Sequence, residues 1–222
     1  MKKLVTGHQR FRDHAFAEHR ELFERLASGQ RPQALFVTCS DSRISPNLLT
    51  QTDPGDLFIL RNAGNIVPPH GACASGEAAT IEYAIEALGV RDVVVCGHSH
   101  CGAMRALVEG GTEALPSVER WLELAAPTRR VITTCYRDCD PEVQFNVAIQ
   151  ENVLQQLQNL RTHPAVAGRL AAGDLRLHGW VYKLTTGEIF AYDAREGQFR
   201  PLGEVPVGAV ARRPAATDVL GP

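Results

Sequence analysis

Side chains that could bind a transition metal gather in two short stretches of this 222-residue chain. The first stretch, CSDSR, carries the thiol of Cys39, the carboxylate of Asp41 and the guanidinium of Arg43. The second stretch, CGHSHC, carries four candidates, Cys96, His98, His100 and Cys101. Zinc takes thiolate and imidazole ligands, so both stretches supply donors suited to a zinc site.

Spacing separates these donors into unequal candidates. Two residues separate His98 from Cys101, so one turn can bring both to a single ion. Cys96 ends an apolar run and is expected to be a small buried side chain, with His100 as the turn residue between the ligands. Taken alone, HSHC is explained equally well by metal binding and by ordinary packing of these side chains. Cys39, however, is available as a third ligand and would supply a second thiolate. Two thiolates and one imidazole are used in catalytic zinc sites, where water takes the fourth position.

Asp41 and Arg43 flank Ser42 and are close enough to form an ion pair. A carboxylate beside a guanidinium stays ionised, so Asp41 would accept hydrogen bonds instead of donating a proton. The alternative is a surface ion pair of little energetic consequence. The position of the Asp41–Arg43 pair next to the expected metal favours a role for Asp41 in the site over a surface ion pair.

Predicted secondary structure places the two stretches together. Buried strands are expected at 34–38, in DLFILRNAGN and in RDVVVCG, with a helix from Ser75 to about Leu88 between them. Strands that alternate with helices predict a single α/β domain with a central, mostly parallel sheet flanked by helices. Ligands bind such sheets at the carboxyl ends of the strands, which is where both stretches lie.

The remaining pattern predicts an N-terminal helical arm within 1–31, a domain over 32–202 and a Pro/Gly/Ala-rich tail over 203–222. The arm helix is expected at 8–27. A long helix begins after Asp140 with an apolar stripe of Val143, Val147, Leu154 and Leu157, a short helix follows Pro164, and two strands lie within LRLHGWVYKLTTGEIFAYD.

Composition excludes several classes of protein. The chain has 23 Lys plus Arg against 25 Asp plus Glu, and no basic cluster that would bind nucleic acid. No apolar run approaches the roughly 20 residues of a membrane span, and the N-terminus lacks the apolar segment of a signal peptide. We therefore expect a cytoplasmic protein with a small neutral or anionic substrate. Six cysteines in a reducing compartment favour metal binding or catalysis over disulfides.

The pair CSDSR and GHSHCGA resembles the signatures of the β-class carbonic anhydrases, and GDLFILRNAGNIV, IEYAI and LHGWVY extend the resemblance to about Leu202. The resemblance implies reversible hydration of carbon dioxide to bicarbonate and a proton, with one Zn²⁺ per chain held by Cys39, His98 and Cys101. Asp41 is implied to pair with Arg43 and either to orient the attacking hydroxide or, in a closed inactive state, to take the fourth zinc position. Because two thiolates donate more charge than imidazoles, we expect activity that rises at alkaline pH.

The same resemblance implies roles for residues outside the two stretches. Gln30 matches an amide that faces the substrate, and Phe58 and Tyr83 match pocket residues supplied by the neighbouring subunit. The implied unit is a homodimer or a higher assembly of dimers, in which the arm packs on the partner. Members inhibited by bicarbonate at a second site carry a tryptophan where this chain has Phe36, so the chain is predicted to be non-allosteric although Arg61 matches that site. Some members are packaged in carboxysomes.

Two other functions remain open from the sequence. Carbon disulfide and carbonyl sulfide hydrolases resemble this family and use the same zinc ligands. A catalytically silent zinc protein is the third possibility, against which the presence of Gln30, Asp41 and Arg43 argues. Cys73 and the pair Cys135 and Cys139 are interpreted as ordinary thiols, and the interpretation of His178 is a hydrogen-bonded structural residue.

Overall fold

A computed structural model describes residues 1–73 and 75–205 of the chain. Its strands are β1 (Ala34–Cys39), β2 (Leu57–Asn62), β3 (Asp92–His98), β4 (Arg176–Tyr182), β5 (Ile189–Asp193) and β6 (Gln198–Pro201). Its α-helices are α1 (Lys2–Arg10), α2 (Phe16–Glu18), α3 (Arg20–Ala27), α4 (Pro46–Thr50), α5 (Gly76–Glu82), α6 (Gly102–Glu109), α7 (Pro116–Leu122), α8 (Ala126–Cys135), α9 (Pro141–Arg161) and α10 (Pro164–Ala172). No helix within these described ranges is long and apolar enough to cross a membrane.

The strands form one sheet in the order β2-β1-β3-β4-β5-β6. The pairs from β2 to β4 are parallel, and β5 and β6 are added antiparallel. In register, Cys39 lies beside Asn62 of β2, and Thr38 beside Cys96 of β3. The predicted α/β fold with a mostly parallel sheet is therefore confirmed, and β1 and β3 end at the same edge.

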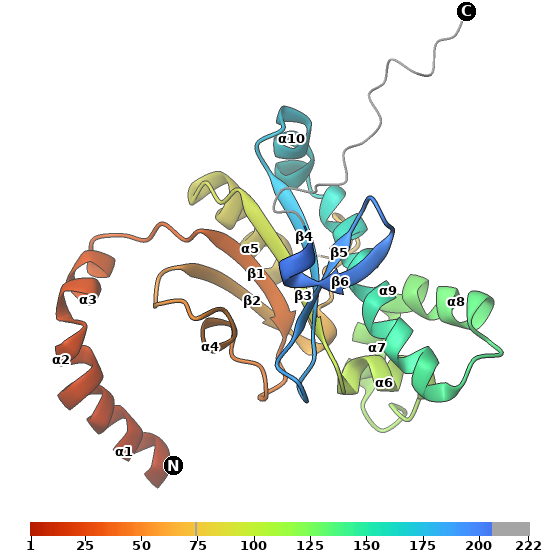
Figure 1. Cartoon of the computed structure of the whole chain (residues 1–222), viewed down its shortest axis with the longest axis horizontal. Coiled ribbons are helices and arrows are strands. Elements are labelled where there is room, and N and C mark those ends of the chain that lie inside the picture. The colour runs from red at the N-terminus through yellow and green to blue at the C-terminus, as the bar shows by residue number, and fades with distance from the viewer. Residues whose placement is uncertain (74, 206–222) are drawn as a thin grey trace, which may run out of the picture.

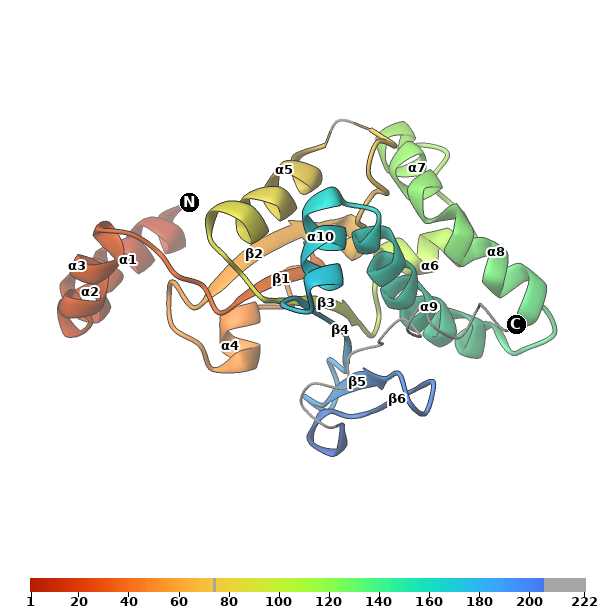
Figure 2. The ribbon, with the colours of Figure 1, turned by 90° about the horizontal axis from the view of Figure 1, so that it is seen from above.

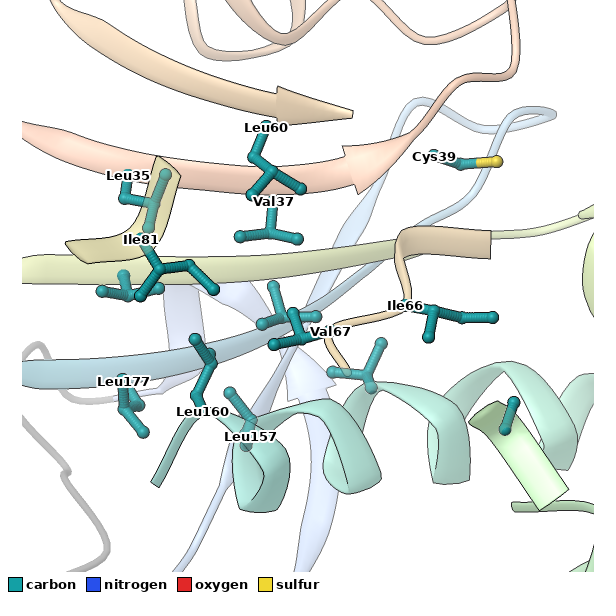
Figure 3. Packing of buried hydrophobic residues seen from close by; sticks show 14 of the residues in the cluster. Leu35, Val37, Cys39, Leu60, Ile66, Val67, Ile81, Leu157, Leu160 and Leu177 are labelled. Atoms are coloured by element: carbon teal, nitrogen blue, oxygen red, sulfur yellow. The ribbon is translucent and has the colours of Figure 1, made fainter. Parts of the chain in front are cut away.

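Helices cover the two faces of the sheet unequally (Figure 2). The larger core lies on the face covered by α5 and α9, where Leu35 and Val37 of β1 meet Ile81 of α5 and Leu160 of α9 (Figure 3). On the other face, Phe36 packs with Leu49 of α4 and with Trp180. This alternation of side chains along β1 follows from the period of two in a β-strand.

The N-terminal helices extend away from the body of the domain (Figure 1). The predicted helix at 8–27 begins earlier, at Lys2, and contains a π-helical turn, η1 (Phe11–Ala15), and an interruption at His19. Rings of Phe11, Phe16 and Phe23 pack against one another. No residue of these helices is buried, so the arm forms no core of its own within the described chain.

Helix α9 corrects one sequence prediction. Its start is as expected, because the Asp140 side chain caps the helix by accepting from the Glu142 amide. Its buried face follows the predicted stripe only in part: Val143 is 47% exposed, Val147 and Leu154 are half-buried, and Leu157 is buried. The buried side instead contains Phe145, Ala148, Ile149, Val153 and Leu160 together with Asn152, Gln156 and Asn159.

Other parts of the chain were missed or lie outside the description. The sequence did not indicate helix α6 or strand β6. The short helix α10 ends as predicted at Gly173, whose φ of 78° is in the left-handed region. Most of the predicted tail, residues 206–222, falls outside the described residues.

Candidate metal centre

The edge of the sheet brings three predicted zinc ligands together. Cys39 ends β1, His98 ends β3, and Cys101 is the N-cap residue of α6. Their donor atoms all lie within 4.8 Å of one another, and all three residues are buried. Crossing from β3 into α6 within three residues places His98 and Cys101 on one turn, while the parallel pairing of β1 and β3 brings in Cys39.

His98 tests whether this group fits a metal ion. Its Nδ1 atom lies 2.9 Å from the carbonyl oxygen of Ser99, which holds the ring in place. Its Nε2 atom is buried and has no hydrogen-bond partner among the described residues. Leaving a buried polar atom unpaired costs about 1–3 kcal/mol. An ion bound by this nitrogen and the two sulfurs would satisfy it, so the donor set fits zinc.

The pKa values of the two thiols shift in opposite directions. A hydrogen bond from Cys101, with smaller contributions from His98 and the Gly64 amide, lowers the pKa of Cys39 to about 4 against the opposing effect of burial. The same contact raises the pKa of Cys101, and burial adds to that rise. By contrast, burial raises the pKa of Cys96 to about 12. The centre is therefore prepared for one thiolate, and a cation would displace the remaining proton.

Arg43 holds the carboxylate of Asp41 with both of its oxygens engaged. Asp41 Oδ1 accepts from Nε of Arg43 at 2.9 Å and from its backbone amide at 3.0 Å, and Oδ2 accepts from Nη2 at 2.6 Å. These bonds hold the pKa of Asp41 well below its usual range although partial burial opposes them. Asp41 Oδ2 also lies 4.0 Å from Nε2 of His98. An ionised acceptor is thus fixed beside the Cys–His–Cys group.

Three further hydrogen bonds join arginine side chains to backbone carbonyls beside this carboxylate. Nη2 of Arg43 donates to the carbonyl oxygen of His100 at 3.0 Å. His100 itself is exposed and has a φ of 58°, as expected for the turn residue between the ligands. Arg61 donates to the carbonyl oxygens of Cys39 and Asp41 at 3.0 and 2.8 Å. Arginines from two segments therefore fix the path of the chain after β1.

The three residues matched to the substrate pocket do not reach this centre in their own chain. Phe58 and Tyr83 lie side by side, with ring centroids 5.9 Å apart, and Tyr83 is 51% exposed. Phe58 pairs with Leu35 near the start of β1, whereas Cys39 ends that strand. Gln30 is exposed in the segment between α3 and β1. Phe58 and Tyr83 thus lie together away from the Cys–His–Cys group of their own chain.

The sequence interpretation missed the residues that surround Cys39. The amide of Gly64 donates to Cys39 Sγ at 3.3 Å. Asn152 of α9 donates in turn to the carbonyl oxygen of Gly64 at 2.9 Å. The available signal was the run of amide residues at 152, 156 and 159, which recurs with helical spacing on one side of α9.

Residues set aside from the sequence lie elsewhere. Cys73, Cys135 and Cys139 are exposed. His178 is hydrogen-bonded as expected, because its Nε2 lies 2.8 Å from Asp92 Oδ1. A groove of about 780 Å³ lies between α5 and α10 and is lined by none of the three candidate ligands.

Comparisons with known proteins identify the family of this chain. Residues 34–189 match the family described as carbonic anhydrase. A carbonic anhydrase of Synechocystis sp. is 51% identical over 195 residues, 87% of this chain and 71% of that protein, and one of Pseudomonas aeruginosa is 45% identical over 216 residues, 96% and 98% of the two chains. The solved β-carbonic anhydrase CcaA superposes with a TM-score of 0.89 at 49% identity, covering 90% of this chain and 98% of that one. With the mostly parallel sheet and the Cys–His–Cys group at its edge, these matches show that the chain belongs to the β-carbonic anhydrase family.

Proposed function

We propose that this chain catalyses the zinc-dependent reversible hydration of carbon dioxide to bicarbonate and a proton. The observation that carries the proposal is the buried, unpartnered Nε2 of His98 beside the thiols of Cys39 and Cys101. A structural zinc site has four protein ligands, whereas a catalytic one keeps a position open. This centre has three donors beside the ionised carboxylate of Asp41, which is already bound to Arg43, and this arrangement suits a catalytic zinc site.

Cys39, His98 and Cys101 would hold the metal ion. When bound, zinc would acidify a water molecule and so supply a nucleophile, at a more alkaline pH than with three imidazole ligands because two thiolates donate more negative charge. The chain's own part is to keep one thiolate ready at Cys39 and to hold the ring of His98 through its contact with Ser99. Burial of all three donors limits competition from bulk water.

Asp41 would orient the attacking group as a hydrogen-bond acceptor. Its low pKa keeps it ionised, so it cannot donate a proton at physiological pH. Of its two implied roles, orientation and ligation in a closed state, the pairing with Arg43 favours orientation, because both carboxylate oxygens are already engaged. To ligate the metal, Asp41 would have to give up its shortest bond to that guanidinium.

The active unit we propose is a homodimer. Leu4, Val5 and Phe11 on the N-terminal arm are 68%, 53% and 41% exposed, which is typical of an apolar surface that packs on another chain. Phe58 and Tyr83 lie away from the metal centre of their own chain, which supports their supplying the pocket of the partner. Gln30, on the segment that joins the arm to β1, would face the substrate in the assembled dimer.

We propose that the enzyme lacks bicarbonate inhibition at a second site. Phe36 occupies the position of the tryptophan and packs against Trp180, with ring centroids 6.0 Å apart. Arg61 is engaged with the carbonyl oxygens of Cys39 and Asp41. Rates should therefore show no slow inactivation by bicarbonate below neutral pH.

Stopped-flow measurement of carbon dioxide hydration on zinc-loaded protein tests the main proposal. A rate above buffer that rises toward alkaline pH and is lost on chelation supports it. No rate above buffer in protein with full zinc content would overturn it. Parallel assays with carbonyl sulfide and carbon disulfide decide the substrate, because faster hydrolysis of either one would assign the site to those hydrolases.

A further inference from the structure

The loop that follows β2 touches the metal centre through a single backbone group. The amide of Gly64 donates to Cys39 Sγ at 3.3 Å. Gly64 has a φ of 78°, and a Cβ there would lie 3.0 Å from Cβ of Ala103 and 3.1 Å from the terminal methyl of Met104. The backbone therefore approaches α6 so closely that the position requires glycine. Cys39 thus receives a hydrogen bond from a loop whose placement depends on its surroundings.

Buried amide side chains of α9 hold this loop in place. Asn152 donates to the carbonyl oxygen of Gly64 at 2.9 Å, and Gln156 donates to Asn152 Oδ1 at 2.8 Å. Gln156 Oε1 accepts from the amide of Val67 at 2.9 Å, and Asn159 donates to the carbonyl oxygen of Val67 at 2.8 Å. All three amides are buried, with 1%, 0% and 4% of their surface exposed. We call Asn152, Gln156 and Asn159 the amide ladder.

Helix α7 also binds this loop, through a tryptophan side chain. Trp121 of α7 donates through Nε1 to the carbonyl oxygen of Ala63 at 2.8 Å. The peptide groups on either side of Gly64 are thus bound by Trp121 and Asn152. Farther along, Nε2 of His163 lies 3.0 Å from the carbonyl oxygen of Pro68. The bonds nearest to Cys39 are therefore those of Asn152 and Trp121, while Asn159 anchors the loop at Val67.

We propose that Asn152 is a positioning residue for the metal centre: by holding the carbonyl of Gly64, it directs the Gly64 amide at Cys39 Sγ and so tunes how strongly that sulfur binds zinc. This inference rests on the zinc site proposed above. Asn152 touches neither the metal nor the substrate, so its effect passes through the loop. Asn159 makes the same kind of bond to the carbonyl oxygen of Val67, three residues farther along the loop and away from Cys39. The proposed role therefore belongs to Asn152 and not to Asn159.

The physical basis is the effect of hydrogen bonds on a metal-bound sulfur. An N–H group directed at a thiolate withdraws electron density from it, and groups in this outer layer orient the ligand. Their loss changes metal affinity by about 10- to 100-fold in proteins generally. The donating amide belongs to the Ala63–Gly64 peptide, and Asn152 fixes the peptide that follows it. Removal of the Asn152 side chain should therefore release the second of the two peptides that flank Gly64, so that the Gly64 amide is aimed less firmly at Cys39 Sγ. Cys39 would then lose part of this hydrogen bond and be held in a less defined position.

The test compares Asn152→Ala with Asn159→Ala. Both remove a buried amide from the same helix and a bond to the same loop, so both should lower stability to a similar degree. In Co²⁺-substituted protein, Asn152→Ala should shift the thiolate-to-cobalt charge-transfer band to longer wavelength, and Asn159→Ala should leave it in place. Zinc release to a chromogenic chelator should be about 10-fold faster in Asn152→Ala than in Asn159→Ala.

The outcomes separate this inference from the metal site itself. If wild-type protein shows no cobalt–thiolate band, the proposed metal site is wrong and this inference falls with it. A wild-type band that is unchanged in Asn152→Ala, or changed equally by both variants, overturns the inference alone. Should Asn152→Ala not fold, Trp121→Phe removes the bond to the Ala63 carbonyl, which is part of the same peptide group as the donating Gly64 amide, and it should shift the band in the same direction. An unshifted band in that variant would likewise overturn the inference.

Discussion

Asp41 Oδ2 lies 4.0 Å from Nε2 of His98, an atom with no hydrogen-bond partner in the part of the chain that the structure describes, and Arg43 holds this carboxylate in place. The arrangement fixes an acceptor beside the atom that a metal would join. Nε and Nη2 of Arg43 each donate to one oxygen of the Asp41 carboxylate. The orientation of the carboxylate therefore depends on the planar, two-pronged guanidinium group of arginine.

Replacement of that fork should impair the reaction without removing the metal. Arg43→Lys keeps the charge but cannot make two parallel bonds to Asp41, so we expect kcat/KM for carbon dioxide hydration to fall about 100-fold. Zinc content, measured by elemental analysis, should stay unchanged. Arg129→Lys, an exposed arginine on α8, is the control. Full activity in Arg43→Lys would show that Asp41 is oriented by other means.

Removal of the β1 thiol should abolish zinc binding. Cys39→Ser leaves only His98 and Cys101 of the three donors, and a serine hydroxyl is a poor zinc ligand at neutral pH. Purified variant protein should contain almost no zinc and show no activity. Cys135→Ser, which changes an exposed thiol, should keep both. Stoichiometric zinc in Cys39→Ser would contradict the ligand set.

Zinc binding should release protons in an amount set by the two thiols. At pH 7 Cys39, with a pKa of about 4, is already ionised, while Cys101, whose pKa is raised, keeps its proton. Binding should therefore displace about one proton from the pair, and zinc affinity should increase with pH. Calorimetry in buffers of different ionisation enthalpy measures this number. A value near two would mean that both thiols are protonated in the free protein.

A pH-dependent contribution to stability is expected at the opposite end of β3. Arg176 first, and His178 second, lower the pKa of Asp92 below its ordinary 3.8. A carboxyl with a lowered folded-state pKa adds stability above its unfolded value and loses it as pH falls through the folded one. Asp92→Asn should thus lower the free energy of unfolding at pH 7 by about 1 kcal/mol, since the half-exposed Arg176 is partly screened.

Denaturant unfolding of wild type and Asp92→Asn at several pH values tests that sign. The two curves should converge as the pH is lowered below 3.8, the ordinary value for Asp92. Asp138→Asn, at an exposed position between α8 and α9, should leave stability unchanged throughout. A difference that grows on acidification would be the opposite of the expected behaviour.

The contact between α9 and the sheet depends on small residues in β3 and β4. A Cβ on Gly97 would lie 2.9 Å from Cγ2 of Val153 and 3.3 Å from Cγ2 of Ile149. Gly97→Ala should therefore push α9 from the sheet and lower stability by about 1–3 kcal/mol. Gly168→Ala in α10 has nothing within 4 Å and should not destabilise the protein. Thermal unfolding of both variants gives the comparison, and equal stabilities would show that α9 adapts freely.

Residue types and local spacing determined much of this protein. The alternation of apolar runs with capped helices predicted the parallel sheet, and the caps at Ser75 and Asp140 lie where expected because capping depends on neighbouring residues alone. The rule that parallel strands end at one edge then joined Cys39 to His98 and Cys101 across some 60 residues of sequence.

Only the tertiary structure decided which side of α9 faces the core. Hydropathy assigns Asn152, Gln156 and Asn159 to solvent, yet they are buried because backbone groups of a loop about 90 residues earlier satisfy their hydrogen bonds. The same holds for the charge state of the thiols, since the pKa of Cys39 depends on Cys101 and Gly64. The helical spacing of the amides is visible in the sequence, but their hydrogen-bond partners in the distant loop are not, so the environment of the metal centre depends on how the chain packs.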